Sequence, residues 1–326
     1  MSSIVTGTVV EVVVPATSAN LGPGYDALGL AVSQHDELIA IVTDDAGVRV
    51  DVEGQGAATL PSDETHLVAR AAAQGFSAVG IPLPGLLIRC RNTIPQGRGL
   101  GSSAAAIVAG LLIARGLIDD GDVSLDDEAV LSIATAMEGH PDNVAAALFG
   151  GFTTAWADTT EGEVSAHAIS RQVHPAVTPI VAIPPTAVST RAARELLGDT
   201  VSREAAVFNI ARVAALSHAL CSDPQLLFLA TEDRLHQQDR ASTYPESHRI
   251  MAGLRERGHA SMISGAGPAV LTLVGTQNVT DVQQSRVTDE VVTQMRHICG
   301  PDWLVLALTV DHQGAQMHRR RLSAGG

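Results

Sequence analysis

The sequence contains no lysine, so all 21 of its basic residues are arginine. The lysine of a Walker P-loop and the strand lysine of protein kinases are therefore both excluded. If this chain binds a nucleotide, groups other than a lysine ammonium must hold the phosphates.

Cysteines and long apolar runs are also scarce. Cys90, Cys221 and Cys299 are odd in number and far apart, which predicts free thiols in a reducing compartment rather than a disulfide framework. No apolar run reaches the roughly 18 residues that a membrane span needs, and the N-terminal segment lacks a basic flank and a small-residue cleavage site. We therefore expect a cytoplasmic protein without a membrane segment.

The net charge of the chain limits the classes of binding partner that are expected. The formal net charge is −14 over 326 residues, which argues against nucleic acid or an anionic membrane surface as the main partner. Small polar ligands remain open. The length is sufficient for two domains, each with its own core.

Strand-like and helix-like segments are mixed along the chain, which predicts an α+β fold. Strands are expected at 8–14, 37–42, 48–52, 86–91, 151–157, 178–183, 260–264, 270–274 and 304–310. Helices are expected at 65–79, 102–115, 125–137, 142–148, 203–220, 224–231, 246–257 and 280–296. The polar stretch 158–170 predicts a boundary between two α+β domains, 1–170 and 171–326. The basic run 318–321 is expected to be a solvated tail.

The most informative segment is the glycine-rich loop 95–101, which runs directly into an alanine-rich helix. Gly97, Gly99 and Gly101 allow the backbone to turn its N–H groups toward one point. The positive end of the following helix supports an anion at that point. The loop therefore predicts a phosphate-binding cradle.

The same loop fits a second motif, because 99–104 matches the G-x-G-x-x-A fingerprint of dinucleotide-binding proteins, with Asp119 and Asp120 about 20 residues further on. That fingerprint needs its first glycine directly after a strand and its acid at the end of a second parallel strand. Here the loop 92–98 intervenes, and a helix with Ser124 as its N-cap is expected after Asp120. A hydride-transfer enzyme is therefore disfavoured. A simple tight turn is disfavoured too, since one glycine would suffice for it.

The residues around the cradle favour a magnesium ion. A hydroxyl at a helix start, here Ser102 or Ser103, can coordinate Mg²⁺ beside a polyphosphate, and a carboxylate would complete the protein ligands. Glu138 is placed at a helix end, where it opposes the helix dipole and favours a nearby cation, although a solvated helix end explains it as well. His140 has no second ligand at metal spacing and is expected to be a capping or packing group.

Two more loops carry backbone signals. The segment 15–29 follows the first strand directly and places Ser18, Asn20 and Asp26 among glycines and prolines, so that their side chains can be held outward. The loop 264–269 lies between two apolar strands, and its glycines allow close approach to a ligand or to the cradle. A plain hairpin explains this last loop equally well.

With these three loops in this order, the chain resembles the GHMP kinases, the superfamily of galacto-, homoserine, mevalonate and phosphomevalonate kinases. The resemblance spans nearly the whole chain, and within the superfamily the chain looks like the homoserine kinases. The narrower match is carried by 14–31, 138–152, 189–194, 235–240 and 264–269. Tyr25 stands where that family usually has Phe, and the early arginine and acidic signature of galactokinases is not found.

The resemblance implies a two-domain fold with a ribosomal-S5-like N-terminal domain, a ferredoxin-like C-terminal domain and the site between them. It implies Mg-ATP-dependent phosphorylation of the side-chain hydroxyl of L-homoserine, the step before threonine synthesis. The implied ATP-binding residues are Pro95, Gln96, Gly97, Arg98, Gly99, Leu100, Gly101, Ser102, Ser103, Ala104 and Ala105, with Ser103 and Glu138 on Mg²⁺. The implied substrate residues are Asn20 and Asp26 for the amino group, Asn143 beside the reacting hydroxyl, and Arg194 and Arg240 for the carboxylate.

Alternatives remain at this stage. Some superfamily members use an aspartate base where this chain has Asn143, and Asp142 beside it is left open as a base. A base is not required if positioning, Mg²⁺ and the cradle supply the acceleration. Another GHMP kinase acting on mevalonate or a sugar, and a GHMP-like binding protein without catalysis, are the rival functions. A homodimer is also left open.

Overall fold

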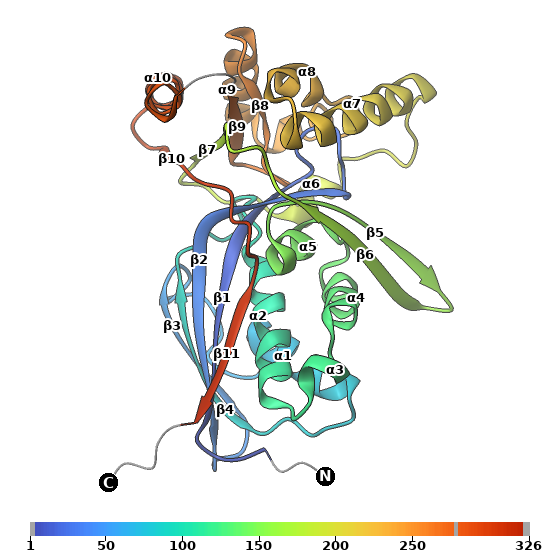
Figure 1. Cartoon of the computed structure of the whole chain (residues 1–326), viewed down its shortest axis with the longest axis vertical. Coiled ribbons are helices and arrows are strands. Elements are labelled where there is room, and N and C mark those ends of the chain that lie inside the picture. Colours follow the sequence, from blue (N-terminus) through green and yellow to red (C-terminus); the bar gives the residue numbers. More distant parts are fainter. Residues whose placement is uncertain (1–3, 277–279, 322–326) are drawn as a thin grey trace.

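The computed structural model describes residues 4–276 and 280–321. Figure 1 shows two sheets, one above the other along the long axis of the molecule, with helices packed against each. This mixed arrangement confirms the α+β class. In the described part of the chain, no helix is both long enough and apolar enough to cross a membrane.

The lower part is built on a seven-stranded sheet with the order β11-β1-β2-β4-β3, in which β5 pairs with β2 and β6 pairs with β5. Its strands are β1 (Thr8–Ala19), β2 (Leu28–Thr43), β3 (Val48–Gly54), β4 (Gly85–Asn92), β5 (Phe152–Thr160), β6 (Glu163–Arg171) and β11 (Gln316–Arg321). Its helices are α1 (Leu67–Ala78), α2 (Ser102–Leu117), α3 (Gly121–Ser124), α4 (Asp127–Glu138) and α5 (Asp142–Phe149).

The upper part is built on a four-stranded antiparallel sheet with the order β10-β7-β9-β8. Its strands are β7 (Val177–Ile183), β8 (Ala260–Ile263), β9 (Val270–Gly275) and β10 (Leu304–Ala307). Its helices are α6 (Thr190–Arg194), α7 (Arg203–Cys221), α8 (Leu227–Ala230), α9 (Pro245–Glu256) and α10 (Asp281–Cys299), with short 3₁₀ turns η1 (Pro224–Leu226) and η2 (Ala241–Thr243).

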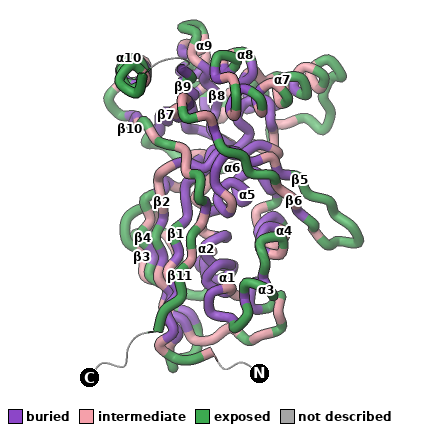
Figure 2. Tube along the Cα trace, in the orientation of Figure 1, coloured by how far each residue is buried: buried purple, intermediate pink, exposed green. Residues whose placement is uncertain are grey.

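Helix α2 lies at the centre of the lower part because it is apolar on every side. Apart from Gly110, Arg115 and Gly116, the residues from Ala104 to Leu117 are alanine, leucine, isoleucine and valine, and nearly all of them are buried (Figure 2). A helix of this kind is stable only when other elements enclose it. It packs against β1, α1, α4 and α5, which holds its first turn in a defined place for the glycine loop.

The first strand is longer than predicted. We expected it to end at Val14, with a polar loop from Pro15, but β1 continues to Ala19 after a register shift between Pro15 and Ala16. Residues 16–19 pair with the start of β2, and their apolar or hydroxyl side chains fit a buried strand. Ser18 therefore points into the interior and is fully buried, contrary to the expectation that it faces outward.

Two segments expected to lack regular structure form strands. The polar stretch 158–170 is mostly the hairpin of β5 and β6, whose far end projects from the body of the molecule (Figure 1). The expected tail 318–321 belongs to β11, which pairs antiparallel with β1. Ion pairs from Arg319 to Asp119 and from Arg320 to Glu11 replace bulk water as its partners.

These strands bear on the division of the chain. The upper sheet uses residues 177–307, whereas β11 returns to the lower sheet. The boundary near residue 170 stays a prediction. A division at that point would assign β11 to the C-terminal domain, although this strand pairs with β1 in the lower sheet. The expected N-cap at Ser124 is wrong, because Asp126 caps α4 by accepting the Ala129 N–H. The three cysteines are free thiols, as predicted.

Candidate active site

The glycine loop between β4 and α2 adopts the left-handed backbone that glycine allows. The φ angle is 64° at Gly97, 76° at Gly99 and 69° at Gly101. A Cβ at Gly99 would lie 2.1 Å from the Ser264 carbonyl oxygen, and one at Gly101 would lie 1.9 Å from Thr17 Oγ1. Gly101 is the N-cap residue of α2 and makes no side-chain cap, so the first N–H groups of the helix can bind an anion.

The two other loops meet this cradle. Ser264 Oγ lies 2.6 Å from the Gly99 carbonyl oxygen and 2.8 Å from Ser18 Oγ. Asn20 Nδ2 donates to the Gly265 carbonyl oxygen at 2.8 Å. From the sequence, a close approach of 264–269 to the cradle and a plain hairpin were equally good explanations of this loop. The close approach is therefore confirmed. The contacts join three loops that lie far apart in the chain.

Ser103 and Glu138 lie side by side at the mouth of the cradle. Ser103 is in the first turn of α2 and Glu138 is the last residue of α4, and Ser103 Oγ donates to Glu138 Oε2 at 2.7 Å. A hydroxyl and a carboxylate in contact are the hard oxygen donors that Mg²⁺ uses together with phosphate oxygens. The packing of α4 against α2 brings this pair together.

Asp142 organises the residues that follow Glu138. It is buried at the start of α5, where its Oδ1 accepts the Asn143 N–H at 2.7 Å and lies 2.6 Å from His140 Nδ1. Burial by itself would lower the pKa of His140, but the hydrogen bond and the charge of Asp142 outweigh it and raise this pKa. Asn143 Oδ1 accepts a hydrogen bond from Thr17 Oγ1 at 2.7 Å, which leaves the amide N–H₂ as the donor available to a ligand.

His140 has more neighbours than its sequence context indicated. Ligand atoms of Asp26, His140 and Asp142 lie within 4.8 Å of one another. The expectation that His140 lacks a second ligand at metal spacing is therefore wrong, because Asp26 comes from a loop more than a hundred residues away. The expectation that it is a packing group agrees with its burial and its bond to Asp142.

Arg194 and Asp26 form a two-point ion pair. Arg194 Nη1 lies 2.9 Å from Asp26 Oδ2, and Arg194 Nη2 lies 2.6 Å from Asp26 Oδ1. The same Nη1 donates to the Tyr25 hydroxyl at 2.8 Å. Burial and the negative charge of Asp26 raise the pKa of Tyr25, so its hydroxyl stays protonated. Two residues that the resemblance assigned to opposite ends of a substrate thus neutralise each other in this structure.

Arg240 lies beside this pair, but its guanidinium has a different set of hydrogen-bond partners. Its side chain is almost completely buried, and its Nη2 donates to the Tyr25 hydroxyl at 3.3 Å. Its Nε is buried without a hydrogen-bond partner, and no carboxylate among residues 4–276 and 280–321 forms an ion pair with it. A buried guanidinium with no acidic partner is costly unless a ligand supplies the negative charge.

These groups line one cleft. It collects Asn20, Asp26, Pro95, Gly97, Gly99, Leu100, Gly101, Ser102, Ser103, Glu138, Asn143, Arg194 and Arg240, together with His140 and Asp142. The side chain of Arg98 takes another direction and donates to the carbonyl oxygens of Pro184 and Pro185. It ties the glycine loop to the segment after β7. Ala104 is buried inside α2.

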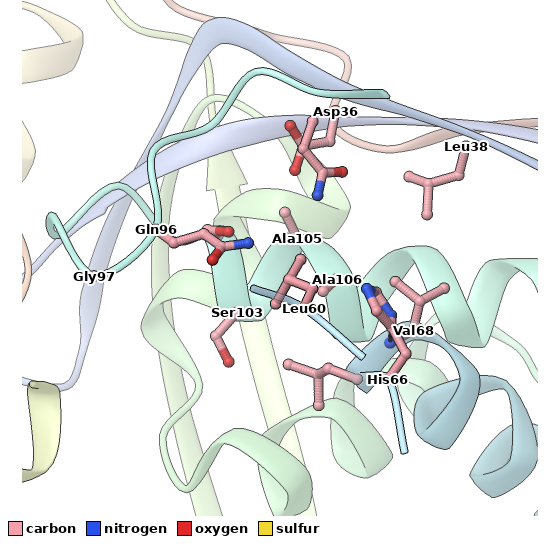
Figure 3. Close-up of a pocket in the computed structure, with 13 residues that line it drawn as sticks. Asp36, Leu38, Leu60, His66, Val68, Gln96, Gly97, Ser103, Ala105 and Ala106 are labelled. Atoms are coloured by element: carbon pink, nitrogen blue, oxygen red, sulfur yellow. Dashed lines mark hydrogen bonds between the residues drawn. The ribbon is translucent and has the colours of Figure 1, made fainter. Parts of the chain in front are cut away.

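A second cavity, of about 210 Å³, lies on the other side of the glycine loop. Figure 3 shows Leu60, Val68 and Ala106 around it, with Gln96 and Ser103 toward the loop. Asp36, Leu38, Leu67, His66, Asn92 and Ala105 complete much of the lining. Of these residues, the family motif implies a ligand-binding role for Gln96, Ser103 and Ala105 alone. The others come from β2, the segment before α1, α1 itself, β4 and α2, and no family motif covers them.

Comparison with known proteins gives consistent matches. The family model of the GHMP kinases N terminal domain matches residues 66–151. The chain is 48% identical over 314 residues to the homoserine kinase of Clavibacter michiganensis, covering 96% of this chain and 95% of that protein. It is 44% identical to the homoserine kinase of Streptomyces coelicolor, over 94% of this chain and 93% of that protein.

Among solved structures, the homoserine kinase of Cytophaga hutchinsonii superimposes with a TM-score of 0.81 at 26% identity. The match covers 98% of this chain and 99% of that one. The similarity therefore extends over both sheets and the cleft between their loops, not only over the glycine loop.

Proposed function

The chain belongs to the homoserine kinase family within the GHMP kinases, and from this premise we propose how its cleft phosphorylates the side-chain hydroxyl of L-homoserine with ATP. The product, O-phospho-L-homoserine, leads to threonine. The backbone N–H groups of 97–103 and the N-terminus of α2 hold the phosphates. The left-handed glycines and the uncapped first turn support this role.

Ser103 and Glu138 would hold the magnesium ion. The fit rests on their contact of 2.7 Å at the mouth of the cradle, because a hydroxyl and a carboxylate suit a hard cation that also takes phosphate oxygens. When bound there, Mg²⁺ neutralises phosphate charge during transfer. Glu138 opposes the dipole of its own helix, and a cation offsets that cost.

The observation that carries the substrate class is the set of one carboxylate and two guanidinium groups in the cleft. Asp26 supplies the negative charge, and Arg194 and Arg240 supply the positive charges. An α-amino acid is the complementary ligand: its ammonium takes Asp26, and its carboxylate takes the guanidinium groups. Arg240 is the stronger anchor, because its buried Nε has no partner among the described residues.

Asn20 organises the amino-group end. Its Oδ1 accepts the Asp26 N–H at 3.0 Å, and its Nδ2 bonds to Gly265. The amide oxygen keeps a second lone pair for a substrate ammonium. Asn20 thus also positions Asp26, which has a φ of 53°.

Asn143 is the residue that would orient the reacting hydroxyl of the substrate. Thr17 holds its amide oxygen, so its N–H₂ group orients the hydroxyl oxygen toward the phosphate. Asp142 is engaged with His140 and the Asn143 N–H, which favours a positioning role for it over a base. In a loose transition state, positioning and electrostatic stabilisation supply most of the acceleration without a base.

The test is an ADP-release assay on a panel of hydroxyl acceptors: L-homoserine, L-threonine, L-serine, mevalonate and galactose. We expect kcat/KM to be highest for L-homoserine, and higher for the amino acids than for mevalonate or galactose. The reason is that Asp26 and the two arginines are complementary to the ammonium and carboxylate of an amino acid. A higher kcat/KM for mevalonate or galactose would contradict the amino-acid assignment. ADP release without an acceptor serves as the background.

A further inference from the structure

The cavity beside the glycine loop contains a buried polar atom that no group in the described part of the chain satisfies. His66 is 3% exposed, and its Nε2 is buried without a hydrogen-bond partner among the described residues. Figure 3 shows His66 at one end of the cavity, next to Val68 and Ala106. The walls around it are otherwise mainly apolar. A lone polar atom of this kind indicates a ligand that completes it.

The protonation of His66 follows from its place at the start of α1. It is the N-cap residue, and its Nδ1 accepts the Val68 N–H at 3.2 Å. Burial lowers the pKa of His66, so the ring is neutral near pH 7. A neutral imidazole that accepts at Nδ1 carries its proton on Nε2. The helix cap therefore makes Nε2 a hydrogen-bond donor, and residues 4–276 and 280–321 provide no acceptor for it.

The position of the cavity suggests which part of a ligand enters it. Gly97, Ser102 and Ser103 line both this cavity and the cleft with the phosphate cradle. A nucleotide with its phosphates on the cradle can therefore extend its base into the cavity. Leu38, Leu60 and Val68 provide apolar walls for a flat ring.

The opposite end of the cavity offers an acceptor. Figure 3 shows Asp36 across the cavity from His66. Asp36 is buried, and its Oδ1 accepts the N–H groups of Thr93 and Ile94 at 2.7 and 2.9 Å. In the described part of the chain no donor bonds its Oδ2. The cavity thus presents a donor at one end and an acceptor at the other.

We propose that His66 determines the nucleobase specificity of this kinase by donating from Nε2–H to a ring nitrogen of adenine, while Asp36 accepts from the adenine amino group. Adenine offers both an amino donor and ring-nitrogen acceptors. Guanine places a keto oxygen where adenine has the amino group, and that oxygen would face the Asp36 carboxylate. The inference rests on the proposed binding of ATP phosphates at the glycine loop.

Calorimetric binding of ATP analogues tests the proposal without catalysis. ATP, 1-deaza-ATP, 3-deaza-ATP, 7-deaza-ATP and GTP are titrated into the wild-type protein. We expect one deaza analogue to bind about 10-fold more weakly than ATP, because an unpaired buried donor forfeits its hydrogen bond. GTP should lose more, since it also opposes Asp36.

The variant His66→Ser separates recognition from helix capping. Serine keeps an N-cap acceptor for α1 but has no group equivalent to Nε2–H. The variant should bind ATP about 10-fold more weakly and show no further loss with the analogue that wild type discriminates. Asp126→Ser makes the same kind of cap exchange on α4, outside the cavity lining, and should leave all affinities unchanged.

Two outcomes overturn the proposal and are distinguishable from each other. If every deaza analogue binds wild type as ATP does, or if His66→Ser keeps the discrimination, His66 does not read the base. The variant Ala106→Phe fills the cavity from α2. If it leaves ATP affinity unchanged, the base does not enter this cavity. The proposed phosphate site at the glycine loop fails only if Gly101→Ala also leaves ATP affinity unchanged.

Discussion

The two hollows on either side of the glycine loop differ in chemistry although they share its backbone. The cleft on one side holds acids, a histidine and two arginines, most of them already paired with one another. The cavity on the other side combines leucine, valine and alanine side chains with the buried Asp36 and His66. The difference indicates that charge would recognise the ligand proposed for the cleft, whereas shape, the His66 donor and the Asp36 acceptor would recognise the ligand proposed for the cavity.

Each hollow nevertheless contains one buried donor that has no partner within the described ranges of the chain. In the cleft it is Arg240 Nε, and in the cavity it is His66 Nε2. The first is part of a cation and the second belongs to a neutral ring. Their loss should therefore differ in size, because hydrogen bonds to charged groups contribute more than neutral ones.

The largest effect should come from Glu138, the proposed metal ligand in the cleft. Glu138→Gln removes the carboxylate charge at nearly constant size, and turnover should fall by about 10²- to 10³-fold as phosphate charge loses its compensation. ADP release at saturating Mg²⁺ and substrates measures it. The control is Glu128→Gln, an exposed residue in the first turn of the same helix. Wild-type turnover in Glu138→Gln would remove this residue from the metal site.

The proposed anchor of the substrate carboxylate should come next. Arg240→Ala should lower kcat/KM for L-homoserine by about 10- to 150-fold, as expected for a charged hydrogen bond of roughly 1.5–3 kcal/mol, while KM for ATP changes little. Arg194→Ala should cost less, because Asp26 already occupies its guanidinium. Arg249→Ala, an exposed change on α9, is the control.

The decarboxylated analogue 3-aminopropan-1-ol sharpens this comparison. Wild type should use it poorly, and Arg240→Ala should lose most of its preference for homoserine over it. Equal use of both compounds by wild type, together with normal kinetics in both arginine variants, would remove the carboxylate clamp.

The shared backbone should respond to a smaller change. Gly101→Ala combines a left-handed backbone with a Cβ 1.9 Å from Thr17 Oγ1, so it should displace the cradle and weaken ATP binding by about 10-fold or more. Gly80→Ala is matched, with a φ of 68° but nothing within 4 Å of its Cβ. It should lower the free energy of unfolding by about 1 kcal/mol without changing ATP affinity. Equal ATP affinities in both variants would separate the loop from the phosphates.

The smallest effect should be a pH dependence of stability in the cleft. The pKa of His140 is raised in the folded protein by Asp142, so the protonated pair stabilises the fold below the unfolded pKa of about 6.5, and this stabilisation is lost as pH rises through the folded pKa. Urea unfolding of wild type and His140→Asn should show a difference that shrinks above about pH 6.5. His312→Asn, at an exposed histidine, is the control. A difference that is constant with pH would contradict the shift.

Local patterns predicted much of the secondary structure. Strands at 48–52 and 86–91 and helices at 102–115 and 142–148 differ from the observed elements by two residues or fewer at each end. The failures occur where a remote partner decides the conformation. The basic run 318–321 is polar on both faces, so only its pairing with β1 makes it a strand. The polar stretch 158–170 likewise forms strand structure because β5 and β6 pair with each other.

The sequence by itself determined the cradle, because three glycines allow the left-handed backbone conformations that turn N–H groups toward one point at the start of an alanine-rich helix. Family motifs in the sequence also indicated Ser103, Glu138, Asp26, Arg194 and Arg240 as site residues. Only the tertiary structure decided how these residues are paired: Asp26 forms an ion pair with Arg194, whereas none of the acids that the structure describes pairs with Arg240. It also created the cavity with His66 and Asp36, which no motif indicated. The reason is that distances between side chains from separate elements depend on how helices and sheets pack, and that packing is a property of the whole chain rather than of any local pattern.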